Sequence, residues 1–307
     1  MKSKIMLGTR GSKLAVWQAE WVKARLEGIY KGLTVELLKI KTTGDKILDV
    51  PLAKVGGKGL FVKEIEEAML RGEIDIAVHS MKDVPVAFPP ELHLPVICER
   101  EDPRDALISN GVKFADLPHG AKIGTSSLRR SCQLLSIRPD LRIVQLRGNL
   151  ETRFRKLGEK EFDAMILAAA GVKRLGWQER ITECISAEIS LPAIGQGAIG
   201  IECRKDDAET NKMIAALNHD ETSICVTAER ACLAKLEGGC QVPIAAHAVL
   251  DGAHLKMRGL VGSVDGKIIL RSEAEGSAAD AGAIGLRLAE DLLSKGADRI
   301  LAEVYGK

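Results

Sequence analysis

The sequence lacks a large excess of charge of either sign. Its 44 lysine and arginine residues nearly balance 42 aspartate and glutamate residues, which gives a formal net charge of +2. A dedicated nucleic-acid-binding protein normally carries a large basic excess. Aromatic residues make up only 3% of the chain, so few side chains are available to stack on bases. The composition therefore argues against nucleic acid as a partner.

The sequence also lacks paired cysteines and long apolar runs. Its 7 cysteines are an odd set without a C-x-x-C pair, which is typical of reduced intracellular thiols rather than of disulfides or a metal site. The apolar run Ile5-Met6-Leu7 before Gly8 is too short for a signal-peptide core. No apolar stretch approaches the ~18 residues that span a bilayer. We therefore expect a soluble, cytoplasmic protein without a membrane partner or a bound metal.

What the sequence does contain, over its first two thirds, is an alternation of short apolar runs and helical patterns. This alternation predicts α/β units around mostly parallel or mixed sheets. The 307 residues, 46% of them hydrophobic, are enough for two or three packed domains. The expected strands are residues 35–40, 74–78, 94–98, 122–124, 142–146, 164–168 and 198–203. The expected helices are residues 13–27, 62–70, 128–137 and 150–157.

Two breaks in this pattern are candidate crossings between domains. Residues 99–103 are a charged break, and residues 191–197 are rich in proline and glycine. Two crossings favour a second domain inserted into the first. From about residue 221 the pattern changes to three short strands (245–250, 255–261 and 267–271), with a turn at Asp265-Gly266 and a helix over 279–295. We expect three domains, at residues 1–98 with 198–217, 103–192, and 220–307.

Three strand-to-helix turns carry arginines. They are residues 9–12 (TRGS), 124–130 (GTSSLRR) and 147–149 (RGN), the last followed by Arg153 and Arg155. Backbone N–H groups and the helix dipole at such turns favour a negative ligand, and arginine grips carboxylate or phosphate through two parallel hydrogen bonds. Any one of these arginines is equally well explained as an exposed surface residue. Together they predict a site for a ligand with several negative charges.

Residues 56–59 (GGKG) resemble a phosphate-binding loop only superficially. The Walker pattern needs G-x-x-x-x-G-K-[ST], and here a glycine follows Lys58 while the spacing fails. A phosphoryl-transfer enzyme is therefore a weak alternative. We interpret residues 45–57 as a mobile loop, with Lys58 at the start of a helix.

Two further segments carry candidate reactive groups. The stretch His79-Ser80-Met81-Lys82-Asp83 follows an apolar strand, where α/β folds place functional residues. Asp83 could be a catalytic carboxylate or half of an ion pair with Lys82, and His79 is better explained as a structural histidine. Cys240 lies between two preceding glycines and a proline at position 243, beyond Val242, which predicts an accessible thiol in a loop, with a tight structural turn as the alternative. Without metal partners around it, a covalent role is favoured over a metal role.

At these residues the sequence resembles the porphobilinogen deaminases, also called hydroxymethylbilane synthases. The resemblance covers essentially the whole chain, and its most specific part is residues 228–243, AERACLAKLEGGCQVP, which matches the cofactor-attachment signature of that family. Many members have proline where this chain has Lys13, which is not a ligand contact in the family. The other matching segments are residues 9–12, 56–61, 78–85, 99–105, 124–130, 146–149 and 191–197.

The resemblance implies two α/β domains like the lobes of periplasmic binding proteins, flanking a cleft, and a small α+β C-terminal domain. It implies a transferase that adds four porphobilinogen molecules to a dipyrromethane cofactor on Cys240, with loss of ammonia, and then releases hydroxymethylbilane for tetrapyrrole biosynthesis. It also implies that Asp83 is the catalytic carboxylate, stabilising cationic intermediates and moving protons. A monomer whose small-molecule substrate is porphobilinogen is expected.

The resemblance also assigns binding roles, residue by residue. The residues it implies for the cofactor, besides Cys240 and Asp83, are Lys82, Ser127, Arg129, Arg130, Arg147 and Gly148. The residues it implies for the substrate are Arg10, Ser12, Lys58, Arg153, Arg174 and, at the hinge, Gln196. A competing hypothesis from another class is a two-lobed binding protein for an anionic ligand. The missing export signal and the Gly-Gly-Cys loop argue against it.

Overall fold

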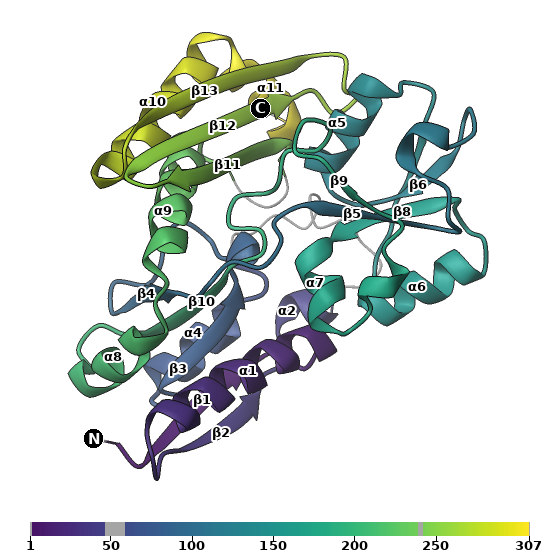
Figure 1. The fold of residues 1–307 in the computed structure, drawn as a ribbon. Helices are drawn as coiled ribbons and strands as arrows, with labels where there is room; N and C mark the ends of the chain where they lie inside the picture. Colours follow the sequence, from purple (N-terminus) through teal and green to yellow (C-terminus); the bar gives the residue numbers. More distant parts are fainter. Residues whose placement is uncertain (1, 47–58, 239–241, 307) are drawn as a thin grey trace. The chain divides into compact units, whose positions relative to one another are not determined.

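The computed structural model of the chain describes residues 2–46, 59–238 and 242–306 (Figure 1). It divides into two compact units, Met1–Glu101 with Ala198–Ser223 and Asp102–Gly197 with Ile224–Lys307. The second unit contains both a five-stranded and a three-stranded sheet. The three domain boundaries expected from the sequence stay a prediction.

The first unit is built on a five-stranded mixed sheet of order β2-β1-β3-β10-β4. The first three strands in this order are parallel, and β10 is antiparallel to both of its neighbours. The parallel strands therefore end at one edge of the sheet, from which the loops to the helices start. The strands are β1 (Lys4–Thr9), β2 (Thr34–Lys39), β3 (Ile76–Ser80), β4 (Leu92–Ile97) and β10 (Ile199–Arg204).

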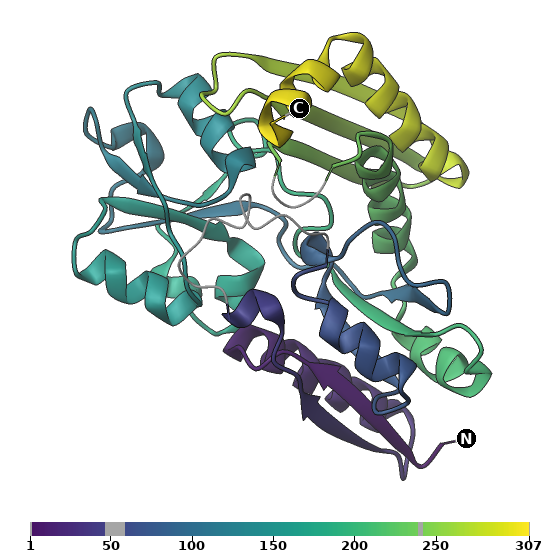
Figure 2. The same ribbon diagram turned by 180° about the vertical axis from the view of Figure 1, so that it is seen from behind.

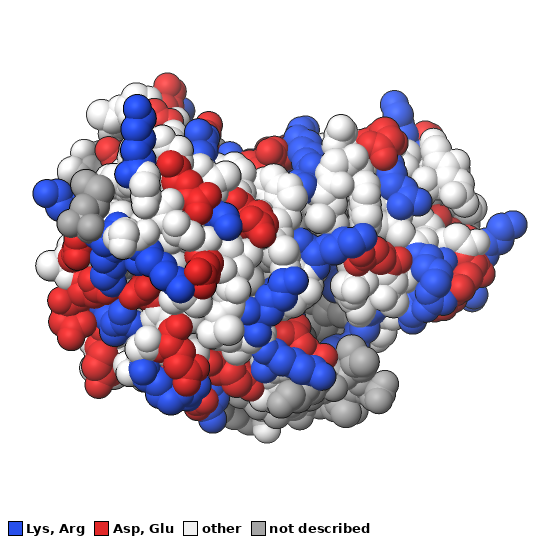
Figure 3. Space-filling model, turned by 90° about the horizontal axis from the view of Figure 1, so that it is seen from below, with Lys and Arg blue, Asp and Glu red and all other residues white. Residues whose placement is uncertain are grey.

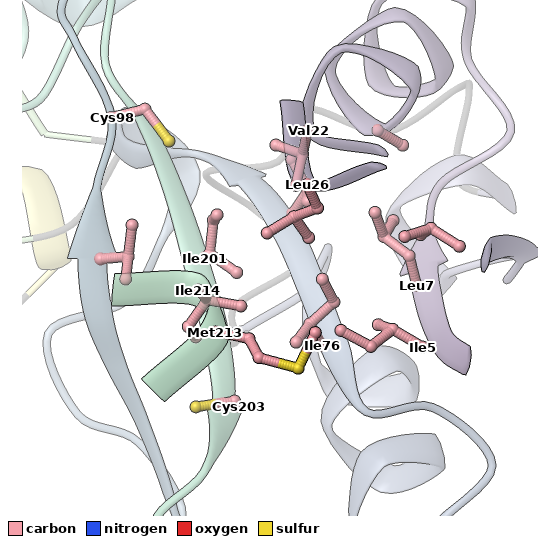
Figure 4. Packing of buried hydrophobic residues seen from close by; sticks show 14 of the residues in the cluster. Ile5, Leu7, Val22, Leu26, Ile76, Cys98, Ile201, Cys203, Met213 and Ile214 are labelled. Atoms are coloured by element: carbon pink, nitrogen blue, oxygen red, sulfur yellow. The ribbon is translucent and has the colours of Figure 1, made fainter. Parts of the chain in front are cut away.

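Helices cover both faces of this sheet. On one face, Val22 and Leu26 of α1 (Lys13–Ile29) pack with Ile5 of β1, as Figure 4 shows. On the other face, Ile65 of α4 (Lys63–Leu70) packs with Ala77 of β3. The β-branched and leucine side chains of the strands fill both interfaces, which explains why the strands read as continuous apolar runs. The shorter helices are α2 (Thr43–Lys46), η1 (Met81–Asp83), α8 (Ala208–Ile214) and η4 (Ala215–Leu217).

The second unit repeats this topology. Its five-stranded sheet has the order β7-β6-β8-β5-β9, with β7, β6 and β8 parallel and β5 antiparallel to both neighbours. The strands are β5 (Asp105–Ser109), β6 (Lys122–Gly124), β7 (Arg142–Val144), β8 (Ala164–Ala168) and β9 (Glu183–Ile185). The helices are α5 (Leu128–Ile137), α6 (Leu150–Gly158), α7 (Ala169–Arg174), η2 (Phe114–Asp116) and η3 (Gln178–Arg180).

A three-stranded antiparallel sheet, order β11-β12-β13, completes the second unit. Helix α10 packs across it, as Figure 2 shows. The sheet also contacts α5, because a Cβ atom at Gly262 would lie 2.8 Å from Sγ of Cys132. The elements are β11 (Ile244–Asp251), β12 (His254–Gly262), β13 (Ile269–Ser277), η5 (Ala278–Asp280), α10 (Ala281–Ser294) and α11 (Ala297–Tyr305). Helix α9 (Asp220–Lys235) begins in the first unit and continues into the second.

The structure confirms the predicted α/β fold class and corrects details. Asp45, assigned to a mobile loop, lies in helix α2, and residues 47–57 of that loop lie outside the described residues. The strand expected at residues 74–78 begins two residues later, at Ile76. The strand expected at 267–271 begins at Ile269 and continues to Ser277 as an edge strand of the small sheet, with exposed residues at every second position from Arg271 on.

Candidate active site

A pocket lies in the first unit, where the parallel strands β1 and β3 end. The turn after β1 leads into α1, and Ser12 caps that helix by accepting a hydrogen bond from the Ala15 backbone N–H, 3.3 Å away. The partial positive charge of a helix N-terminus therefore faces the pocket. The pocket is lined by Arg10, Ser12, Leu14, Ala15, Gln18, Phe61, Val62, Val78, His79, Ser80 and Asp83.

Arg10 is held in place on two sides. Its guanidinium pairs with the Asp45 carboxylate, with Nε 3.1 Å from Oδ1, and lies 4.2 Å above the centre of the Phe61 ring. Burial opposes the ionisation of Asp45, but the hydrogen bonds and charge of Arg10 outweigh it and hold the pKa of that carboxyl below its usual value. Arg10 thus presents a preorganised cation to the pocket, with part of its charge neutralised by Asp45.

Asp83 follows β3 in the short helix η1, and its carboxylate is half-buried at the pocket. Across residues 2–46, 59–238 and 242–306, no hydrogen bond or ion pair engages this carboxylate. Lys82, beside it in η1, is also half-buried. The alternative in which Asp83 is half of a local ion pair therefore has no support in the described contacts. An uncommitted carboxylate at a pocket wall is suited to stabilising positive charge on a ligand.

His79 connects the pocket to two carboxylates, one buried and one half-buried. Its Nε2 atom lies 2.8 Å from Oε2 of Glu202, whose side chain is 0% exposed in β10. Glu66 of α4 belongs to the same cluster. Burial, followed by repulsion from Glu202, raises the pKa of Glu66 to about 7, and the nearby His79 opposes the rise. His79 is thus a buried histidine with a hydrogen-bonded partner, as a structural role requires, and it also lines the pocket.

In the second unit, three of the predicted site residues converge on Asp105. Arg129 donates from Nη1 to Oδ2 (2.7 Å), Arg130 donates from Nη2 to Oδ1 (2.7 Å), and Gln196 donates from Nε2 to Oδ1 (3.0 Å). Ser190 adds a hydrogen bond of 2.7 Å. Burial of Asp105 opposes its ionisation, but the two guanidinium charges prevail and hold its pKa well below the usual range.

The two arginines of this cluster also bond to backbone carbonyls. Arg129 donates to the carbonyl of Leu191 at 2.8 Å, and Arg130 donates to the carbonyl of Ile166 at 3.1 Å. Their exposed fractions are only 4% and 7%. Much of their hydrogen-bonding capacity therefore serves the fold of the second unit, around a cluster whose net charge is still positive.

The turn between β7 and α6 gathers three other predicted residues. Gly148 has a φ of +102°, a conformation that favours glycine, and its carbonyl accepts a hydrogen bond of 2.9 Å from Nε of Arg153. Asn149 caps α6 by accepting from the Thr152 backbone N–H at 2.9 Å. Arg147 is half-buried, and within the described parts of the chain its guanidinium makes no hydrogen bond or ion pair. This turn therefore offers an uncommitted cation at a helix N-terminus.

The remaining predicted site residues are placed as follows. Ser127 is the N-cap residue of α5, but its hydroxyl makes no capping hydrogen bond. Arg174 donates from Nη2 to the carbonyl of Gly197 at 2.7 Å. Lys58 and Cys240 lie outside the described residues.

Two buried carboxylates that pair with residues of the candidate site were not predicted from the sequence, although a signal for each exists. Glu202 is a lone charged residue inside the apolar run of residues 198–203, and such a residue must be paired when its strand is buried. Asp105 directly precedes the apolar run Ala106-Leu107-Ile108 and lies two residues after the charged break at residues 99–103. Both signals indicate a buried ionic partner, although neither identifies it.

The rest of the described structure adds two negative findings. Among residues 2–46, 59–238 and 242–306, no helix is long and apolar enough to cross a membrane. Within the same residues, no group of three or more His, Cys, Asp or Glu side chains is arranged to hold a metal ion. Basic and acidic side chains are interspersed on the face drawn in Figure 3, in line with the small net charge.

Fold and site together define an α/β protein with two sheets of one topology and with cationic groups at several strand-to-helix turns. Models of known families assign it further. Residues 5–212 match "Porphobilinogen deaminase, dipyromethane cofactor binding domain", and residues 223–294 match "Porphobilinogen deaminase, C-terminal domain". The chain belongs to the porphobilinogen deaminase family.

Curated relatives agree with this assignment. The chain is 62% identical over 302 residues to the porphobilinogen deaminase of Geobacter metallireducens, and 61% identical over 302 residues to that of Geotalea daltonii. Each comparison covers 98% of this chain and 95% of the relative.

Among solved structures, the chain is similar to the methionine-binding protein MetQ, with 16% identity, a TM-score of 0.42 and coverage of 72% of this chain and 92% of that one. It is also similar to the periplasmic aliphatic sulphonate binding protein SsuA from Escherichia coli, with 14% identity, a TM-score of 0.42 and coverage of 77% and 71%.

Proposed function

We propose that this chain is a porphobilinogen deaminase, a transferase that joins four porphobilinogen molecules onto a covalently bound dipyrromethane primer and then releases hydroxymethylbilane by hydrolysis. The observation that carries the proposal is the 61–62% identity to curated porphobilinogen deaminases over 98% of the chain. The pocket and the basic turns supply groups for a substrate that carries carboxylates and an amine.

The residues of the second unit fit a primer that carries carboxylates. Arg147 has an uncommitted guanidinium, and Ser127 has a hydroxyl that its own helix does not use. We propose that these two residues, with Gly148 and the Arg129–Arg130 pair, hold the carboxylates of the primer, and that Lys82 and Asp83 contact it from the first unit. When bound through Cys240, the primer supplies the pyrrole carbon to which the first substrate is joined. The positive net charge of the Asp105 cluster supports an anionic neighbour.

Asp83 acts in this proposal as the catalytic carboxylate. Loss of ammonia from porphobilinogen leaves a cationic azafulvene, and a carboxylate near the pyrrole nitrogen stabilises that charge. Its half-buried position at the pocket strengthens the interaction relative to a carboxylate in bulk water. The carboxylate can also take up and pass on a proton during the addition.

Five residues are proposed to bind the carboxylates of the substrate. Arg10 and Ser12 lie at the pocket, where Arg10 is fixed by Asp45 and Phe61. The other three are Lys58, Arg153 and Arg174. Gln196 is proposed as a hinge residue, since its side chain bonds to the Pro103 carbonyl at 2.6 Å and thereby joins the two stretches of chain that leave the second unit.

An assay with pure porphobilinogen tests the function. The expected result is release of one ammonia for each porphobilinogen consumed and of one linear tetrapyrrole for every four, identified by its mass. Asp206→Asn serves as a control variant with unchanged turnover, because Asp206 is an exposed carboxylate of the first unit that lies outside the proposed site. Binding of porphobilinogen without release of ammonia would instead indicate a binding protein.

We also propose that the protein acts as a cytoplasmic monomer. Within the described residues the cysteines at 98, 132, 184, 203, 225 and 232 are free thiols, which supports a reducing compartment. Sedimentation of the purified holoprotein at several concentrations tests the monomer. A molar mass that rises with concentration would contradict it.

A further inference from the structure

Three titratable side chains from different elements meet between helix α4 and the sheet of the first unit. They are His79 of β3, Glu202 of β10 and Glu66 of α4. His79 is 7% exposed and lines the pocket, whereas the Glu202 side chain is 0% exposed. His79 is therefore the member of the cluster that connects the pocket with the two carboxylates.

The negative charge of this cluster is not fully compensated by hydrogen bonds or positive charge. Oε1 of Glu202 and Oε1 of Glu66 are both buried and have no hydrogen-bond partner among the described residues. A buried carboxylate oxygen without a partner is costly, and two negative carboxylates in one place repel each other. One added proton relieves both problems, because a protonated carboxyl is neutral and can donate a hydrogen bond.

We propose that His79, Glu202 and Glu66 form a proton relay that takes up, at the pocket wall, the proton released each time a new pyrrole unit is joined to the chain. The inference rests on the proposed function and concerns residues to which that function assigns no role. In this proposal Asp83 stabilises the cationic intermediate in the pocket. The relay removes the proton that the intermediate loses from its α-carbon.

The atoms and charges of the step balance. In each addition the C–N bond of the incoming aminomethyl group, in its protonated ammonium form, breaks with its electron pair going to nitrogen, and neutral ammonia is the leaving group. The free α-carbon of the growing chain then forms a bond to the resulting cationic methylene carbon. Loss of the proton from that α-carbon restores the aromatic pyrrole. His79 accepts this proton and shares it with the two carboxylates, and the relay returns it to ammonia, which departs as ammonium.

The hydrogen bond of His79 prepares its ring for this role. In the tautomer that carries the proton on Nε2, His79 donates to Oε2 of Glu202 at 2.8 Å, which leaves the lone pair on Nδ1. As the ring takes up a proton, the same carboxylate stabilises the resulting imidazolium, as an acidic partner does for other histidine bases. Glu202 is therefore a positioning residue in this proposal.

Glu66 makes the relay reversible near neutral pH. Its pKa of about 7 means that it binds and releases a proton with little bias at pH 7. The charged groups that face Glu66 are His79 from β3 and Glu202 from β10. The side chains of Met6 in β1, Leu38 in β2 and Ile40, directly after β2, are apolar and pack against the same cluster as α4. Among the described residues that line the pocket, Asp83 and Arg10, the latter paired with Asp45, carry charge on the pocket side.

A titration without turnover tests the protonation directly. Infrared spectra of the holoprotein are recorded between about pH 5.5 and 8.5, since ordinary carboxyls are already ionised there. We expect a protonated-carboxyl band that titrates near pH 7 and disappears in Glu66→Gln. Glu67→Gln, an exposed position on the same helix, serves as the matched control and keeps the band. Absence of this band from the wild-type protein would overturn the proposal.

Kinetics then test whether the relay serves the reaction. With porphobilinogen carrying deuterium at its free α-carbon, Glu66→Gln should lower kcat about 10- to 100-fold, leave KM within about twofold and increase the isotope effect on kcat relative to wild type. Glu66→Asp should recover part of the rate. A variant that retains its primer and unfolding temperature but shows the wild-type kcat and isotope effect would refute the relay. Failure of the wild-type protein to release ammonia would refute the proposed function instead.

Discussion

The Oδ2 atom of Asp105 lies 2.7 Å from the Nη1 atom of Arg129, and the two side chains are 0% and 4% exposed. Arg130 binds the same carboxylate, so one buried anion serves two buried cations. Asp105 follows the first stretch of chain that enters the second unit, and Arg129 also bonds to Leu191 before the second stretch leaves it. The pair therefore ties both stretches to helix α5.

Asp105→Asn should destabilise the protein strongly, because two buried guanidinium groups would lose their counter-charge. Removing one partner of a buried ion pair costs about 3–5 kcal/mol. Denaturant unfolding of the second unit at pH 7 measures the change. Asp116→Asn, an exposed position of the same unit, is the matched control and should stay within about 0.5 kcal/mol of wild type. A loss below about 1 kcal/mol for Asp105→Asn would contradict this account of the cluster.

The same carboxylate gives a pH dependence of defined sign. Its pKa in the folded protein is depressed below the unfolded value of about 3.9, so its contribution is complete above that pH and is lost as the pH falls toward the folded pKa. Unfolding free energies measured from pH 7 down to about pH 3 should therefore decline more steeply for wild type than for Asp105→Asn below about pH 4. If the unfolding free energies of wild type and Asp105→Asn fell in parallel below about pH 4, Asp105 would not be the source of the loss of stability in acid.

Asp83→Asn should retain the covalent primer and lose most of its turnover. The substitution removes the negative charge with little change in shape, and such a loss at a developing cation costs about a thousandfold in rate. Initial rates of ammonia release, compared with those of the Asp206→Asn control, provide the measurement. Near-normal turnover in a primed Asp83→Asn protein would exclude the catalytic role.

Gly148→Ala should destabilise the turn that carries Arg147. Its φ of +102° is unfavourable for alanine, and the new Cβ would lie 2.7 Å from Cγ2 of Thr152. Such strain costs about 1–3 kcal/mol. Gly158→Ala is a matched control at the other end of α6, where the new Cβ meets nothing within 4 Å, and it should be neutral or stabilising. Thermal unfolding compares them, and equal melting temperatures would be incompatible with the strain described.

Glu229→Gln should weaken the contacts of helix α9 with Gly195 and with strand β11 in the second unit. The Glu229 carboxylate is 0% exposed and accepts from the backbone N–H of Gly195 at 2.7 Å and from that of Ala248 at 2.9 Å. An amide has one acceptor oxygen, so one of these donors loses its partner, at a cost of about 1–3 kcal/mol. Amide hydrogen exchange at Gly195 and Ala248 reports the loss, and unchanged protection at both would contradict it. Glu221→Gln, exposed on the same helix, is the control.

Much of the fold could be predicted from sequence because the periodicity of apolar residues follows the elements closely. The strands at 122–124 and 164–168 and the helix at 128–137 have the predicted bounds. Strand β5 was missed because it begins with Asp105, whose charge is tolerated in the core only through its arginine partners. Strand β1 was missed because its apolar run is short, although pairing on both sides makes it central in the sheet.

The sequence allowed the residues of the candidate site to be proposed, but it did not show which residues they pair with. The sequence identifies Asp83 and the arginine-bearing turns, since their positions after strands are visible in the pattern. It does not reveal that Arg129 and Arg130 share Asp105, or that His79 is supported by Glu202, because both pairings join residues far apart in the chain. Such long-range contacts depend on sheet topology, which local periodicity does not determine.

The central claim is that the chain carries and extends a covalent primer on Cys240, and intact-protein mass spectrometry with peptide mapping tests it most directly. We predict a mass excess equal to two porphobilinogen units less their ammonia, located on the peptide that contains Cys240 and absent from Cys240→Ser. Brief exposure to porphobilinogen should add further units in steps of one, up to four. An unmodified chain that acquires no adduct even after incubation with porphobilinogen would contradict the account.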